Sequence, residues 1–380
     1  MKYLGYMFRA VVFYGSILFI LGLTACQRSR VKTNLDALLT DLTEQEGLQQ
    51  CVVYVQKGGE VLYYDASGYR DTSRTVLCQR DDIFRLASQT KAVTVVGLMM
   101  LYEQGLFSID DPIAKYIPAF REDITIRHLL THTSGICIDP PFDSIALRLG
   151  VVTHKTNECV TLEQNVGRMA LLPLKHAPGQ EFTYANNTDV LGRLIEILSG
   201  EDYVQYIHDH LLEPLDMSDT YFYLPKEKAA RLVEIEKDFR IDMPPVVDYT
   251  LHSYPSPSAG LVGTIGDYAH FLSMILAGGI YKGKRFLKEE TLTLMQHNEV
   301  GNKRRENIGF GFAWDVFYNP LPPFNSSCMR WGGMYGTDYL IDPQNDMIII
   351  TYNNHPTSRP IRNNYKQRII DTVYRSLNLY

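Results

Sequence analysis

Three features are scarce in this 380-residue sequence, and each scarcity excludes a class of protein. The 37 Lys and Arg residues do not outnumber the 43 Asp and Glu residues, which gives a formal net charge of -6. Because a nucleic-acid-binding surface is basic, we expect no nucleic acid partner. The six cysteines form no Cys-x-x-Cys pair, which argues against a structural zinc site. No apolar run reaches the roughly 18 residues that a membrane-spanning helix needs.

The amino terminus has the pattern of an address signal. A basic start is followed by an apolar run of 14 residues from Ala10 to Leu23, and then by Leu-Thr-Ala-Cys26. A membrane-spanning helix is the alternative, but the run is short for one. The pattern is similar to a lipoprotein signal, so we expect residues 1–25 to be removed and Cys26 to carry lipid. Gln27 after the cysteine favours the outer membrane of a bacterial envelope, facing the periplasm or the surface.

The rest of the chain has strand-like segments at both ends and helical segments between them. Residues 26–46 predict a lipid anchor and a linker helix, and residues 47–380 predict one domain with a helical lobe over about 106–246. This order favours an α+β fold, in which an antiparallel sheet is assembled from the two termini. The expected strands are Cys51–Val55 and Val61–Tyr64, joined by a hairpin turn at Lys57–Gly59, then Gly309–Val316, Gly336–Asp342 and Met347–Thr351, and a final helix is expected over Ile361–Leu377.

A nearly all-apolar stretch from Phe84 to Gly105 predicts a buried helix with Ser88 and Lys91 at its start. Residues three apart share a helix face, so the hydroxyl and the amine can meet. An amine in poor solvent favours its neutral form and can then take the proton of a serine nucleophile. Ser-x-x-Lys is common by chance, so the remaining parts of a catalytic site must be found elsewhere in the chain.

Two further motifs supply candidates for those parts. Tyr184-Ala-Asn186 follows a Pro-Gly turn, and its phenol can relay a proton while the Asn amide binds a substrate carbonyl. Tyr352-Asn-Asn354 fits the same pattern but comes at a strand end and in the wrong order.

The third motif is Trp331-Gly332-Gly333, followed by Met334. Glycines in a strand mark the close approach of a backbone or ligand. An acyl group along this edge can find the backbone N–H groups of Met334 and Ser88, which together form an oxyanion hole. Taken alone, the same residues are also consistent with a glycine-rich bulge beside a core tryptophan.

In combination these motifs resemble the serine β-lactamase and penicillin-binding protein superfamily, in its class C branch. Longer stretches resemble it too: Ile124–Gly135, His176–Gly179 with Phe182–Tyr184, and Ser258–Asp267. The resemblance covers about residues 35–375. It implies an acyl-enzyme on Ser88, with Lys91 and Tyr184 as the acid/base pair and Asn186 on the substrate.

One position departs from the lactamase pattern. Lactamases and D-Ala-D-Ala peptidases commonly have Lys or His where this chain has Trp331, and Arg330 is expected to face away because strand side chains alternate. Trp-Gly-Gly resembles esterase and acyltransferase members, and a large apolar side chain suits an uncharged group. The basic cluster Lys303–Arg305 is expected to be a solvated loop.

Two histidines and two cysteines are expected to support the fold and not to take part in the chemistry. His128 and His132 stand four apart but lack the glutamate of His-Glu-x-x-His, so we expect structural histidines and no metal or other cofactor. Cys137 and Cys159 are offered as a disulfide across a loop.

The sequence therefore predicts a serine hydrolase that acts on a small-molecule ester. The alternatives are an acyltransferase that uses an alcohol or amine acceptor, a β-lactamase or D-Ala-D-Ala-type peptidase, and a non-catalytic binding protein on the same fold. Substrate identity depends on the loops Cys137–Asn165 and Phe222–Ser256, which carry no interpretable motif, and the oligomeric state is not indicated.

Overall fold

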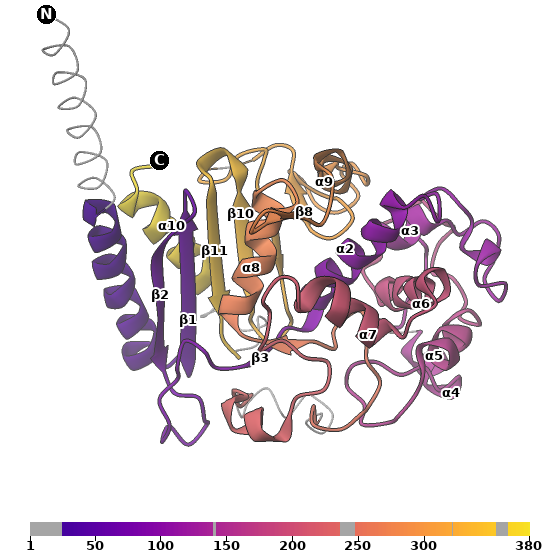
Figure 1. The fold of residues 1–380 in the computed structure, drawn as a ribbon, viewed down its shortest axis with the longest axis horizontal. Coiled ribbons are helices and arrows are strands. Elements are labelled where there is room, and N and C mark those ends of the chain that lie inside the picture. The colour runs from indigo at the N-terminus through magenta and orange to yellow at the C-terminus, as the bar shows by residue number, and fades with distance from the viewer. Residues whose placement is uncertain (1–24, 140–141, 236–247, 321, 355–363) are drawn as a thin grey trace, which may run out of the picture.

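Strands rich in β-branched and aromatic residues form one antiparallel sheet, which Figure 1 shows in the left half of the molecule. The computed structural model describes residues 25–139, 142–235, 248–320, 322–354 and 364–380. In this part of the chain the sheet has seven strands in the order β2-β1-β11-β10-β9-β8-β7. The strands are β1 Gln50–Lys57, β2 Glu60–Gly68, β7 Ile308–Phe310, β8 Asp315–Phe317, β9 Met329–Gly332, β10 Asp338–Asp342 and β11 Met347–Tyr352.

Helices cover both faces of this sheet, so β1 is buried along most of its length. Its side chains alternate between two cores: Val52 and Tyr54 belong to one, and Val53 and Val55 to the other. The first core contains α8 (Ile265–Leu276) and the helical lobe. The second contains the helix at residues 25–40, its continuation η1 (Asp41–Gln45), and α10 (Tyr365–Ser376). The predicted α+β fold, with its sheet drawn from both termini, is confirmed.

The segment that we expected to be a linker is part of the fold. Residues 25–40 are helical, and Val31, Leu35 and Leu39 are buried against the second core beside α10. These apolar side chains recur every four residues, so they form one stripe that the sheet can cover. Residues 1–24, which contain the predicted signal, lie outside the described residues. Among the described residues, no helix is both long and apolar enough to cross a membrane.

The helical lobe is organised around α2 (Thr90–Glu103), whose side chains are almost all buried. In Figure 1 the lobe lies beside the sheet, with α2 running from the sheet into it. The remaining helices of the described residues range from three residues in η3 to 13 in α6. They are η3 Ile113–Lys115, α3 Ile126–Leu130, α4 Asp143–Arg148, α5 Leu162–Met169, α6 Asn187–Ser199, α7 Tyr203–Ile207, η4 His208–Leu212, η5 Lys226–Arg231, α9 Glu289–Gln296 and η7 Pro343–Asn345.

Two element predictions are wrong in detail. Phe84–Arg85 is a short strand, β3, that pairs with β4 (Val262–Gly263) instead of opening the helix. The segment predicted as one strand over Gly309–Val316 is the β7–β8 hairpin. Gly311 donates to Trp314 O at 3.0 Å in its turn, and a Cβ at Gly311 would lie 2.1 Å from Met295 O. Both differences arise from contacts with segments far away in the sequence. The hydrophobic pattern of a segment carries no information about such contacts.

The predicted Cys137–Cys159 disulfide is also wrong, because both cysteines are free thiols. Cys137 is buried and its Sγ donates to Asp139 O at 3.9 Å, whereas Cys159 is exposed. The loop predicted over residues 137–165 instead contains α4 and the start of α5. The final helix, predicted from Ile361, is described from Tyr365, since residues 361–363 lie outside the described residues.

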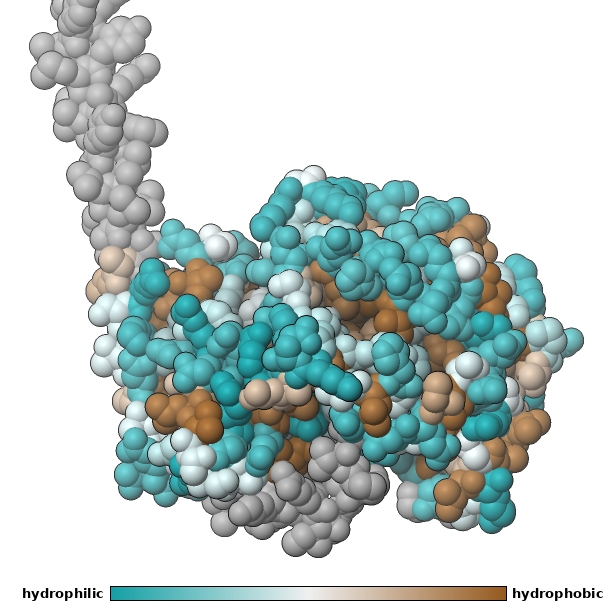
Figure 2. Space-filling model, turned by 60° about the horizontal axis from the view of Figure 1, so that its bottom comes forward, coloured by the Kyte–Doolittle hydropathy of each residue, from teal (hydrophilic) through white to brown (hydrophobic). Residues whose placement is uncertain are grey.

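The molecular surface in the view of Figure 2 is mostly hydrophilic, with apolar residues scattered among polar ones. The large exposed apolar side chains include Leu77, Leu147 and Leu171. Scattered apolar residues are normal on a protein surface, so they do not by themselves indicate a binding site.

Candidate active site

Ser88 lies in a single helical turn, η2 (Ala87–Gln89), between strand β3 and helix α2. Ala87 and Gln89 are buried, whereas Ser88 is only partly buried. Ala87 adopts φ = +46°, a left-handed conformation that costs a non-glycine residue about 1–2 kcal/mol. Packing of Ala87 against Tyr335 and Ile235 accompanies this strain. At the start of a helix the first N–H groups have no intrahelical acceptor, so the N–H of Ser88 is available to a ligand.

Lys91 lies one turn after Ser88, in α2, and its side chain is buried. Its Nζ donates to Ser258 O at 2.9 Å and lies 4.7 Å from the centre of the Tyr184 ring. The structure therefore brings the predicted amine and phenol residues together. In this structure the amine of Lys91 bonds to the Ser258 carbonyl. Hydrogen bonds between catalytic groups are often longer in the absence of substrate and shorten when substrate binds.

The Ser258 carbonyl is held in place by Asp189 of α6, which is fully buried. Asp189 accepts hydrogen bonds from Tyr254 Oη at 2.8 Å, Ser256 Oγ at 3.1 Å and Ser258 N at 2.8 Å. Burial raises the pKa of Asp189, and these donors oppose that rise. Sequence reasoning missed Asp189, because its partners lie 65 to 69 residues later in the chain.

Tyr184 contributes a phenol that no hydrogen bond satisfies within the described part of the chain. Its ring packs against Trp331 and His132, with centroid distances of 5.4 Å and 4.7 Å. Burial lowers the pKa of His132 well below its usual value, and the nearby charges of Lys91 and Arg304 add to this effect. A neutral imidazole fits its contact, because Nδ1 lies 3.0 Å from the Asn187 side-chain amide.

Strand β9 brings the third motif to Ser88. Trp331 is buried, and its Nε1 donates to Ser88 O at 3.2 Å. A Cβ at Gly333 would lie 2.3 Å from Leu86 O, so only glycine permits the strand to approach this closely. β8 pairs with β9 at Met329 and Arg330, which leaves the strand unpaired on that side from Trp331 onward.

Met334 lies in the turn that follows β9. The N–H of Gly333 bonds to Thr337 O at 2.8 Å, and that of Gly336 bonds to Gly333 O at 3.0 Å. This is a β-turn with Met334 at its second position, where the N–H takes no part in the turn. Met334 and Ser88 line the same cavity, as the predicted oxyanion hole requires.

The cavity beside Ser88 has a volume of about 470 Å³. Among the predicted residues, it is lined by Ser88, Tyr184, Trp331, Gly332, Gly333 and Met334. Lys91 does not line the cavity, but its amine lies over the ring of Tyr184, which does. Asn186 is the residue preceding α6, is partly buried, and does not line this cavity. Its predicted contact with substrate therefore stays a prediction.

One prediction about basic residues is wrong in part. Lys303 and Arg305 are exposed, but the guanidinium of Arg304 pairs with Asp315 at 2.9 Å and stacks 5.5 Å from the centre of the Trp331 ring. Arg330 lies on the opposite side of β9 from Trp331, as alternation along a strand predicts, and pairs with Asp338 at 3.0 Å, which Lys366 of α10 also contacts. Arg330 nevertheless lines the cavity.

His128 and His132 have structural roles, as expected. His128 completes the capping box of α3 with Thr125, and His132 packs between aromatic rings. In the described residues, the His, Cys, Asp and Glu group close enough for a metal ion is His208, Asp209 and Glu213, all exposed and far along the chain from Ser88.

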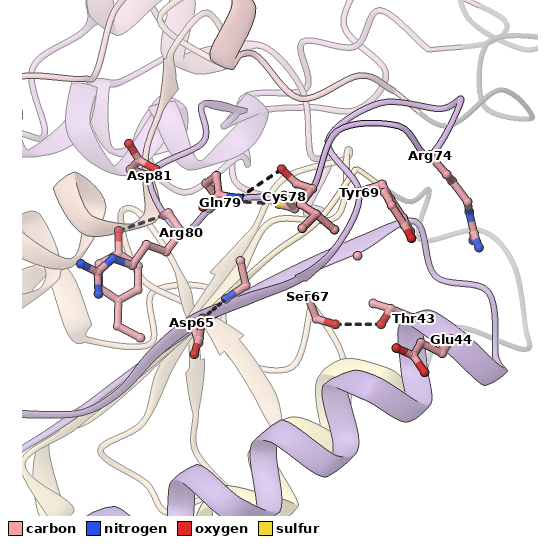
Figure 3. Close-up of a pocket in the computed structure, with 14 residues that line it drawn as sticks. Thr43, Glu44, Asp65, Ser67, Tyr69, Arg74, Cys78, Gln79, Arg80 and Asp81 are labelled. Atoms are coloured by element: carbon pink, nitrogen blue, oxygen red, sulfur yellow. Dashed lines mark hydrogen bonds between the residues drawn. The ribbon is translucent and has the colours of Figure 1, made fainter.

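A second, larger cavity of about 840 Å³ contains none of the predicted site residues (Figure 3). It lies between the end of the amino-terminal helix, strand β2 and the loop that follows β2. Its polar groups largely bond to each other, as in the 2.8 Å contact between Thr43 Oγ1 and Ser67 Oγ. Burial raises the pKa of the Cys78 thiol there, so it is a poor nucleophile. The smaller cavity at Ser88 is therefore the candidate active site, because it is lined by predicted site residues and the larger cavity is not.

Comparison with known proteins agrees with this assignment of the fold. The family model described as Beta-lactamase matches residues 35–373. Protein Rv1367c of Mycobacterium tuberculosis H37Rv is 28% identical over 369 residues, covering 85% of this chain and 90% of that protein. Esterase EstB of Burkholderia gladioli is 26% identical over 355 residues, covering 84% of this chain and 89% of EstB.

A solved structure extends the comparison to three dimensions. EstCE1, described as a hydrolase with promiscuous acyltransferase activity, matches with a TM-score of 0.81 and 26% sequence identity. The match covers 91% of this chain and 99% of EstCE1. The chain is thus similar to an esterase and to a hydrolase over nearly its whole described length.

Proposed function

The chain belongs to the beta-lactamase family, and from this membership we propose that it is a serine hydrolase that cleaves esters through an acyl-enzyme on Ser88. One observation carries the proposal: segments far apart in the sequence meet at one cavity around Ser88. Tyr184 and Met334 line that cavity, and Trp331 bonds to the carbonyl of Ser88 itself. The similarity to EstB and EstCE1 supports ester hydrolysis as the reaction.

In the proposed first step, Ser88 Oγ attacks the ester carbonyl carbon and its proton passes to the Lys91–Tyr184 pair. The negative charge that develops on the carbonyl oxygen is stabilised by the N–H groups of Ser88 and Met334, each worth about 3 kcal/mol. The C–O bond to the alcohol then breaks, and Tyr184 supplies the proton that the leaving oxygen takes up. Water attacks the acyl-enzyme in the second step, which releases the carboxylic acid and restores Ser88.

Labelling with a fluorophosphonate tests the nucleophile directly. We expect one equivalent of label on Ser88, located by peptide mass spectrometry, and none on a Ser88→Ala variant. A panel of 4-nitrophenyl esters of graded acyl length then measures hydrolysis by both proteins. A folded protein that neither takes the label nor cleaves any ester would contradict the proposal and favour a non-catalytic binding protein.

Acyl transfer to an alcohol or amine is the second candidate, because the description of EstCE1 includes promiscuous acyltransferase activity. The two reactions share the acyl-enzyme and differ only in the acceptor that attacks it. Product analysis with an acyl donor, with and without added alcohol, separates them: ester products show transfer and free acid shows hydrolysis. Rapid turnover of nitrocefin in the same series would instead favour a β-lactamase and count against the weight given to Trp331.

A further inference from the structure

The cavity beside Ser88 carries an excess of positive charge. Four basic side chains and two acidic ones line it. They are Arg304, Arg305, Arg330 and Lys366 against Asp315 and Asp338. A cavity lined mostly by one sign of charge concentrates ligands of the opposite sign.

One of these cations, Arg304, lies over Trp331, a predicted substrate-binding residue. Arg304 is bound to Asp315 through two hydrogen bonds of 2.9 and 3.3 Å and lies over the rings of Phe182 and Trp331. Because Trp331 bonds to Ser88 O, a single ring separates this ion pair from the nucleophile's turn. The basic residues that line the cavity and the nucleophile Ser88 therefore belong to one site.

A second group lies deeper, where two cations share one carboxylate. Arg330 Nε lies 3.0 Å from Asp338 Oδ1, and Lys366 Nζ lies 3.3 Å from Asp338 Oδ2. Burial lowers the pKa of Lys366, and the charge of Arg330 adds to this, while Asp338 opposes the fall. A second anion in the cavity would reduce the repulsion between them.

Arg305 is the cation free to meet that anion. It is exposed at the cavity mouth, and its side chain makes no hydrogen bond or ion pair with any other described residue. A guanidinium can bind a carboxylate through two parallel N–H donors. The excess charge is small and two carboxylates are already present, which suits a singly charged carboxylate better than a doubly charged phosphate.

We propose that the cavity selects esters that carry a carboxylate, which is bound by Arg305 at the mouth and drawn toward the Arg330–Lys366 pair. The proposal rests on the ester hydrolysis argued above and names its substrate class. It replaces the expectation, based on Trp331 alone, that the site takes an uncharged group. Trp331 then packs against the apolar part of the substrate while basic residues farther along the cavity receive its charge.

Two matched pairs of substrates test this inference and locate the charge. In one pair the acyl half differs, 4-nitrophenyl hydrogen glutarate against 4-nitrophenyl valerate. In the other the alcohol half differs, 4-butanoyloxybenzoate against 4-butanoyloxyacetophenone. The measured quantity is the ratio of kcat/KM for the charged ester to that for the neutral ester, compared between wild type and variant so that intrinsic reactivity cancels.

Arg305→Glu should lower this ratio about tenfold in one of the two pairs, and Arg305→Gln by about threefold, the scale of a charge-assisted contact near solvent. Arg305 is exposed, so both variants should fold. Arg121→Glu removes an exposed arginine that does not line the cavity and should leave both ratios as in wild type. Because Arg305 is exposed, high salt should also reduce the wild-type preference. Unchanged ratios in both pairs would overturn the proposal.

A binding measurement separates this inference from the proposed reaction. Calorimetric titration of Ser88→Ala with each charged ester, 4-nitrophenyl hydrogen glutarate and 4-butanoyloxybenzoate, should give for at least one of them a Kd that rises about tenfold when Arg305→Glu is added. If wild type cleaves no ester but this difference appears, the proposed reaction fails and the carboxylate site stands. If esters are cleaved but neither the ratios nor the Kd respond to Arg305, the carboxylate site alone fails.

Discussion

The unsatisfied phenol of Tyr184 gives the sharpest residue-level prediction. A buried hydroxyl without a partner adds little or nothing to stability. We therefore expect Tyr184→Phe to keep the melting temperature of wild type and to lower kcat/KM on esters by about 10²–10⁴, the usual contribution of a proton-transfer group. Melting by circular dichroism and ester kinetics measure the two effects. A large loss of stability with activity retained would make Tyr184 a packing residue.

Asp189 is predicted to act through Lys91 without touching substrate. Asp189→Asn keeps the shape of the side chain but turns one acceptor into a donor, which then faces the donors of Tyr254 or Ser258. We expect a loss of about 1–3 kcal/mol in the free energy of unfolding. We also expect a fall in kcat larger than any rise in KM, because Ser258 O would no longer hold the amine of Lys91.

The control for this variant is Asp143→Asn, which changes an exposed carboxylate in α4. Urea unfolding and the pH dependence of kcat distinguish a positioning role from a purely structural one. If the stability falls but the pH profile and kcat stay as in wild type, Asp189 does not position the catalytic amine.

We expect His154 to make the stability of the protein depend on pH. Both of its ring nitrogens are buried without a partner, and burial lowers its pKa to about 3. The unfolded chain takes up a proton below about pH 6.5, which the folded protein excludes, so stability falls as the pH drops below that value. At pH 5 the contribution of His154 is about 2 kcal/mol. Urea unfolding at pH 7 and pH 5 should show this loss, and His154→Leu should reduce it.

At the scale of elements, Gly333 sets the distance between β9 and the nucleophile's turn. A methyl group there would lie 2.3 Å from both Leu86 O and Thr337 Oγ1, so Gly333→Ala must displace the strand. We expect kcat/KM to fall at least about tenfold, because a small displacement misplaces the Met334 donor. Gly167→Ala is the matched control, since no atom lies within 4 Å of its added methyl group and alanine favours its helix.

The elements also mark how far the sequence alone could reach. The β1–β2 hairpin and the strands β10 and β11 were predicted correctly, because alternation and turn residues are local signals. The strand at Phe84 was missed because it exists only through pairing with Val262–Gly263, nearly 180 residues later. The motif residues Ser88, Tyr184 and Trp331 were found by their pattern, whereas Asp189 and Arg304 act through contacts that no short pattern encodes.

At the scale of the whole molecule, the amino-terminal helix determines how the domain would sit on a membrane. We propose that Cys26 is lipidated in a bacterial envelope. Cys26 is exposed within a helix that continues into residues buried beside α10, such as Leu35. Little chain therefore separates the lipid from the folded domain, and the domain would be held close to the bilayer instead of on a long tether.

Expression of the full chain in a bacterium tests this arrangement. Wild type should fractionate with membranes and Cys26→Ser should not, while both proteins take the fluorophosphonate label on Ser88, because the lipid takes no part in the chemistry. Cys159→Ser changes another exposed cysteine and should leave the membrane association intact. Since Leu35 is fully buried, removal of residues 26–46 should abolish cooperative unfolding, not merely release the protein. A truncated protein as stable as the full chain would show that this helix is a linker after all.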